Sequence, residues 1–273
     1  MEVFYLPLNE NWPVDHERHF RGGYWVEKAY DDAYWEGFRG AAEKIAAHVE
    51  ERGWRDTLFE CFLNNKLTHK QDRWEKSSAA WVFDEPSNTQ DFWALRRFGL
   101  EFWAGAARHP HASLAFRADI SRPQWQRDLL DGVTTEEVIS GSLREHAAAV
   151  AARKRRQPVF VSLYGEANRP GTDSAALAAW CVEAWLLGAD GVVPWNTIGR
   201  PESWTEPDPL ALLYPTETGP VPSLRLKCLR SGQQLVEYLT ILAALDGGGR
   251  EALAAAIAAD PNLQARTEKR SEA

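Results

Sequence analysis

Short apolar runs alternate along the chain with longer segments whose apolar residues recur at helical spacing. The runs are rich in Val, Phe, Leu and Trp, which is typical of buried strands. They lie at residues 3–8, 57–63, 79–84, 113–117, 132–135, 158–164 and 190–195. Because strands that alternate with helices build parallel sheets from βα units, the pattern predicts an α/β fold.

Helical spacing predicts the segments that join these strands. The expected helices cover residues 32–52, 88–107, 143–156, 174–187 and 222–245, with a short Ala-rich helix from residue 250. Gly188 is a C-cap signal and Ser223 an N-cap candidate. The charged residues from Arg266 onward predict a disordered tail.

A chain of 273 residues with this alternation fits one TIM-type (β/α) barrel. About seven strands are expected where a complete barrel has eight, and the first run follows Met1 almost directly. We therefore expect an incomplete barrel that lacks its first βα unit. The expected domains are a catalytic barrel over residues 1–245 and a C-terminal helix with a disordered tail over 246–273.

The amino-acid composition argues against a membrane segment and against nucleic acid as a partner. Hydrophobic residues make up 44% of the chain, and no apolar run approaches the roughly 18 residues that span a bilayer, so we expect a soluble protein without a membrane segment. A net charge of −8 argues against nucleic acid as a partner. Thirteen tryptophans suit a protein that stacks on sugar rings, although a Trp-rich core explains any single one equally well. The sequence indicates neither a compartment nor an oligomeric state.

We expect no cofactor and no metal. Cys61, Cys181 and Cys228 show no Cys-x-x-Cys spacing, and His109 and His111 lack the helical spacing of a zinc site. The chain also contains no Gly-x-Gly-x-x-Gly fingerprint and no phosphate-binding loop.

In a βα barrel the active site lies at the carboxyl ends of the strands, so polar residues after each apolar run are the candidates for substrate contacts. These are Glu10, Trp12, Asn64, Lys66, Asp119, Tyr164, Trp195 and Asn196. Tyr164 and Trp195 are candidates for stacking on the sugar, and Asn64 and Lys66 for binding its hydroxyls. Core packing for the aromatic residues and a solvated loop for the polar ones remain the alternatives.

Asp84 and Glu85 are the sharpest candidates for catalysis. Pro86 ends the expected strand and lets both carboxyls turn toward the active site. Cleavage of a glycosidic bond needs one protonated carboxyl and one ionised group. Repulsion between the neighbours, and desolvation by Trp81 and Phe83, would raise the pKa of Glu85. The alternative is a solvated turn, or an acidic charge at the N-terminus of the next helix.

Three segments carry a family resemblance: WVFDEP at 81–86, GADGVVPWNTIG at 188–199 and PSLRLKCLRSGQQ at 222–234, continued to Tyr238. They look like glycoside hydrolase family 123 and its uncharacterised relatives, which share a domain of unknown function at the end of the barrel. The resemblance covers about residues 55–245 and implies a β-N-acetylgalactosaminidase-like enzyme, with the substrate's 2-acetamido oxygen as nucleophile. It makes Glu85 the general acid/base, and Asp84 the residue that orients the acetamido group.

Two other functions remain open. Glu166 follows the strand at 158–164 and would be the nucleophile of an ordinary retaining glycosidase, an arrangement that resemblance suggests. A carboxyl separation of roughly 5 to 5.5 Å from Glu85 would support direct attack. The second alternative is a non-catalytic, carbohydrate-binding remnant of such an enzyme.

Overall fold

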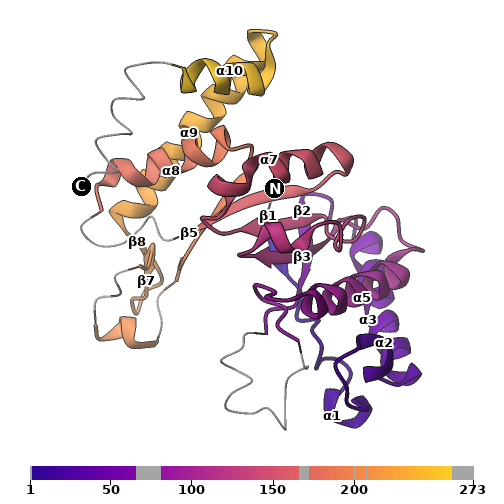
Figure 1. Cartoon of the computed structure of the whole chain (residues 1–273). Coiled ribbons are helices and arrows are strands. Elements are labelled where there is room, and N and C mark those ends of the chain that lie inside the picture. Colours follow the sequence, from indigo (N-terminus) through magenta and orange to yellow (C-terminus); the bar gives the residue numbers. More distant parts are fainter. Residues whose placement is uncertain are drawn as a thin grey trace. The chain divides into compact units, whose positions relative to one another are not determined.

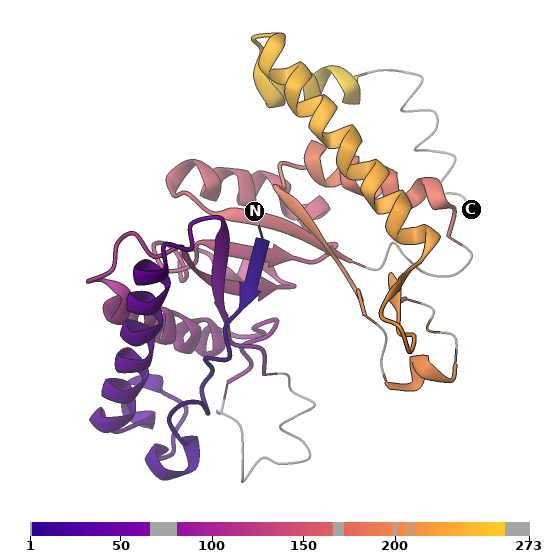
Figure 2. The same ribbon diagram turned by 180° about the vertical axis from the view of Figure 1, so that it is seen from behind.

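A computed structural model describes residues 2–65, 81–165, 172–198, 201–206, 208 and 210–259 (Figures 1 and 2). The chain divides into two compact units, residues 1–164 and residues 165–273. We call them the first and the second unit. The expected domains, 1–245 and 246–273, stay a prediction.

The sheet is parallel and curls like half a barrel, with strand order β1-β2-β3-β4-β5-β6. Its strands are β1 (Glu2–Tyr5), β2 (Thr57–Phe62), β3 (Leu114–Ile120), β4 (Glu136–Ile139), β5 (Phe160–Gly165) and β6 (Gly191–Pro194). Each of the neighbours from β1 to β5 pairs in parallel. The expected α/β class and parallel sheet are therefore confirmed, while the TIM-type closure and the missing first βα unit stay predictions.

Local signals mark the ends of some of the helices in the first unit. They are α1 (His16–His19), α2 (Val26–Ala29), α3 (Asp32–Arg52), α5 (Thr89–Ala106), α6 (Pro123–Gln126) and α7 (Leu143–Arg156). The Asp31 side chain caps α3 by accepting from the Tyr34 N–H, and Gly53 ends the helix with φ of 64°. The expected ranges 32–52 and 143–156 are confirmed.

The expected strand at 132–135 is wrong, because these residues precede β4 instead of forming it. Gly132 has φ of 73°, a turn conformation. β4 begins with Glu136 and Glu137. A prediction from apolar runs passes over these residues, because charged side chains are unusual in a buried strand. Both are buried, and Glu137 is tolerated because Arg153 of α7 forms an ion pair with it.

The expected strand at 79–84 is also wrong over Trp81–Asp84, where the backbone is irregular; Ala79 and Ala80 lie outside the described residues. β1 ends at Tyr5 and not at Leu8, shortly before Pro7, which has no N–H for a sheet. Among the described residues the sheet therefore has six strands, where the sequence predicts about seven.

Aromatic rings fill the core between α3 and α5, which pack side by side (Figure 1). The Phe98 ring lies 5.0 Å from Trp35, 5.3 Å from Phe38 and 5.2 Å from Phe83, measured between ring centroids. Such edge-to-face pairs add to the free energy of burial. Phe83 is fully buried, so this core anchors the segment that carries Asp84 and Glu85.

The second unit is mainly helical. It contains α8 (Ser174–Leu186), the 3-10 helix η1 (Pro201–Trp204), the antiparallel pair β7 (Leu213–Tyr214) and β8 (Val221–Pro222), α9 (Leu224–Leu245) and α10 (Gly249–Ala258). Ser223 caps α9 as expected, by accepting from the Leu226 N–H at 3.3 Å. No helix in the described part of the chain is long and apolar enough to cross a membrane. The tail from Arg266 lies outside the described residues.

Candidate active site

The site is built around residues 81–88, which run between the ends of β2 and β3. Asn65, just after β2, accepts the Phe83 N–H through its side chain at 3.0 Å and the Asp84 N–H through its carbonyl at 3.2 Å. Its amide donates to Glu10 Oε1 at 2.8 Å. The buried Asn65 thus links the loop after β1 to the acidic doublet.

Glu85 is held from the other side by β3, because its N–H donates to the Asp119 carbonyl at 3.1 Å. Its φ is 61°, in the left-handed region that non-glycine residues rarely adopt. Such backbone strain costs on the order of 1–3 kcal/mol and is concentrated at functional sites. Asp84 is buried, with 8% of its surface exposed, and Glu85 is half-buried.

Asp91 in the first turn of α5 holds both ends of this segment. Its Oδ1 accepts from the Val82 N–H at 3.0 Å, and its Oδ2 accepts from the Ser87 N–H at 3.0 Å. Asn88 caps the same helix by accepting from the N–H groups of Gln90 and Asp91. The pattern of strands and loops in the sequence does not single out Asp91, although an acidic side chain three residues after an Asn cap is a recognisable local signal.

A charged cluster lies on the sheet next to Glu85. Arg117 of β3 donates to Asp119 through Nε at 2.7 Å and Nη2 at 3.1 Å, and to Glu60 Oε1 of β2 at 3.0 Å. The cluster continues to Glu136 on β4, whose Cα pairs with that of Arg117 in the sheet register. Of these four residues the sequence indicated only Asp119 as a site residue, because charged residues inside strands are atypical.

Two carboxyls of this cluster bind protons more tightly than usual. Burial raises the pKa of Glu136 to about 8, and repulsion by Glu60 and a hydrogen bond with it act in the same direction. Burial also raises the pKa of Asp119, against the opposing effect of Arg117, and the charge of Glu85 adds to the rise. The region therefore holds a proton at neutral pH, at Glu136.

The other predicted contact residues are spread over both units. Asp119 lies inside β3, not after it as expected, and Asn64 is exposed while its neighbour Asn65 is buried. Trp12 is 49% exposed in the turn after β1. Tyr164 lies near the end of β5 in the first unit, whereas Trp195 and Asn196 follow β6 in the second. Lys66 and Glu166 lie outside the described residues.

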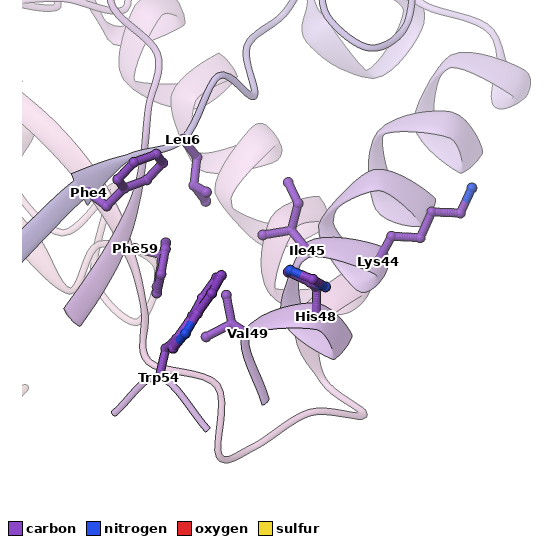
Figure 3. Close-up of a pocket in the computed structure, with 8 residues that line it drawn as sticks. All are labelled: Phe4, Leu6, Lys44, Ile45, His48, Val49, Trp54 and Phe59. Carbon is purple, nitrogen blue, oxygen red and sulfur yellow. The ribbon is translucent and has the colours of Figure 1, made fainter. Parts of the chain in front are cut away.

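A cavity of about 320 Å³ lies between α3 and the strands β1 and β2 (Figure 3). It is lined by Phe4, Leu6, Lys44, Ile45, His48, Val49, Trp54 and Phe59. Successive residues of a strand point to opposite faces, so Phe59 faces this cavity and α3, whereas Glu60 faces the charged cluster. The cavity is therefore separate from the candidate active site.

The candidate site thus offers a buried Asp84, a strained Glu85 and a neighbouring cluster that retains a proton, which are the components of acid/base catalysis. Within the described residues, no group of three or more His, Cys, Asp or Glu side chains is arranged to hold a metal ion.

A scan against protein-family models gave no match to the chain, and a search of curated proteins gave none.

Proposed function

We propose that this chain is a glycoside hydrolase that cleaves an N-acetylhexosaminide, of the β-N-acetylgalactosaminide type, by substrate-assisted retaining catalysis. The observation that carries the proposal is the left-handed backbone of Glu85, whose N–H is bonded to the Asp119 carbonyl of β3, beside buried Asp84. The resemblance of the 81–86 segment to glycoside hydrolase family 123 supplies the substrate class.

In this mechanism Glu85 donates its proton to the glycosidic oxygen as the bond to the anomeric carbon breaks. The acetamido oxygen of the same sugar attacks that carbon and forms a cyclic oxazolinium. Asp84 accepts a hydrogen bond from the acetamido N–H and orients the group. Glu85, now ionised, then removes a proton from the water that opens the ring, so the product retains its configuration.

Hydrolysis of aryl N-acetylgalactosaminides and N-acetylglucosaminides tests this function, with Glu85→Gln and Asp84→Asn as variants. We expect Glu85→Gln to lower kcat/KM by about 100-fold or more, since positioned proton transfer contributes at least that much. Glu51→Gln is the matched control, because Glu51 is an exposed residue of α3. Unchanged kcat/KM in Glu85→Gln would remove Glu85 from the mechanism.

The leaving group adds a sharper test, because an acidic phenol leaves without a proton. The loss in Glu85→Gln should be smaller for such substrates, whereas the loss in Asp84→Asn should not depend on the leaving group. A thiazoline analogue of the cyclic intermediate should inhibit wild type. Absence of inhibition would favour direct attack by Glu166, and sugar binding without turnover would favour the non-catalytic remnant.

A further inference from the structure

We propose that Glu60 and Glu136 share one proton and together position the candidate active site, by keeping Arg117 on Asp119 next to Glu85. The proposal rests on the proposed function for its consequence in catalysis. The shared proton itself can be tested without any substrate.

Two orphaned oxygens point to the shared proton. Glu60 Oε2 and Glu136 Oε2 are buried, and no N–H or O–H donor among the described residues is bonded to either of them. Two ionised carboxylates cannot satisfy each other, because both only accept. A proton on either one creates a donor and pairs both oxygens in a single hydrogen bond. This removes two unsatisfied buried groups, each of which would cost on the order of 1–3 kcal/mol.

The charge balance of the cluster requires the same proton. The charged groups that act on Glu136 are Glu60 of β2 and Arg117 and Asp119 of β3. Within the part of the chain that the structure describes, one guanidinium therefore faces three carboxyls, at sites where Glu60 and Glu136 are only 4% and 6% exposed. Uncompensated buried charge is strongly unfavourable, so one carboxyl stays neutral.

The proton connects this cluster to Glu85 through Arg117 and Asp119. With Glu136 neutral, Arg117 bonds Asp119 through two of its nitrogens, and the carbonyl of Asp119 holds the Glu85 N–H. When the proton leaves, a second full negative charge competes with Asp119 for Arg117. Glu60 and Glu136 are therefore positioning residues. When their shared proton is lost at alkaline pH, Arg117 no longer holds Asp119 in the arrangement that catalysis needs.

The pH dependence of kcat/KM tests this role on aryl N-acetylhexosaminides. Wild type should lose activity as the pH rises through about 8, where Glu136 loses its proton. In Glu136→Gln, whose amide donates to Glu60 at every pH, this alkaline limb should move up by about one unit or disappear, relative to the variant's own maximum. Glu51→Gln should keep the wild-type profile. An unchanged limb in Glu136→Gln would overturn the positioning role.

Infrared difference spectra of the whole chain separate a failure of this proposal from a failure of the proposed function. The protonated-carboxyl band of wild type should lose intensity as the pH rises from about 6 past 8, and Glu136→Gln should lack this change over the same pH range. If wild type hydrolyses no substrate but shows this loss of intensity, the proposed function fails and the shared proton stands. If Glu136→Gln shows the same loss of intensity near pH 8, the shared proton is disproved.

Discussion

At the scale of single residues, the acidic doublet owes its geometry to neighbours that carry no catalytic role. Asn65 accepts hydrogen bonds from the N–H groups of Phe83 and Asp84, and Asp91 accepts from those of Val82 and Ser87. Asp91 is only 1% exposed, so its carboxylate is tolerated because the segment's N–H groups pair with it.

Asp91→Ala should therefore destabilise the first unit. The substitution leaves the Val82 and Ser87 N–H groups without their partner, at a cost of about 2–4 kcal/mol in the free energy of unfolding. Urea denaturation followed by tryptophan fluorescence measures this loss. Gln90→Ala, one residue away on the same helical turn, is the control and should change stability by less than about 1 kcal/mol. Equal stability of the two variants would show that Asp91 does not hold the segment.

At the scale of elements, close approach of α3 and α5 depends on a glycine. A Cβ on Gly105 would lie 2.4 Å from the Arg39 carbonyl oxygen and 2.8 Å from the Ala42 Cβ. Both obstacles belong to α3, so the two helices would have to separate to make room. Separation would loosen the aromatic core around Phe98, which anchors Phe83.

Gly105→Ala should lower the free energy of unfolding by about 1–3 kcal/mol, because overpacking outweighs the gain of up to about 1 kcal/mol in helix propensity. Gly40→Ala is the matched control, since a Cβ there meets no atom within 4 Å. It should stabilise α3 by about 0.5–1 kcal/mol. Thermal unfolding measures both, and a Tm for Gly105→Ala equal to or above that of Gly40→Ala would contradict the packing argument.

The sequence predicted helices better than strands, for a physical reason. Caps such as Asp31, Gly53 and Ser223 act within one turn, so the residues that end a helix are also its neighbours in sequence. Glu137 is tolerated in a strand because Gln126 of α6 and Arg153 of α7 pair with it, and the charge of Arg117 on β3 acts favourably on Glu136. Those partners are invisible to a local pattern.

At the scale of the whole molecule, the shared proton makes stability depend on pH. The pKa of Glu136 rises from an ordinary 4.5 to about 8 on folding, so between these values the folded chain holds a proton that the unfolded chain has released. The contribution of this proton to the free energy of unfolding is complete below pH 4.5 and is lost as the pH rises through 8. Asp31 and Glu50 have pKa values lowered by their hydrogen bonds, so their contributions are lost only at acidic pH.

Wild type should therefore become less stable from about pH 5 to 8, by on the order of 1 kcal/mol per pH unit. Glu136→Gln should flatten this slope, because the amide cannot ionise, while Glu51→Gln should keep it. Urea denaturation at several pH values gives the three curves. Parallel curves for wild type and Glu136→Gln would show that Glu136 does not carry the proton.

The sequence by itself determined the α/β class, the helices with their caps and the acidic doublet, because these depend on residues close together in the chain. Only the tertiary structure decided that Trp81–Asp84 is not a strand and that Asn65 and Asp91 hold it. It also brought Glu60, Asp119 and Glu136 around Arg117, through the register of three neighbouring strands. Register depends on long-range pairing, and the pKa of a buried carboxyl depends on the charges that pairing brings near.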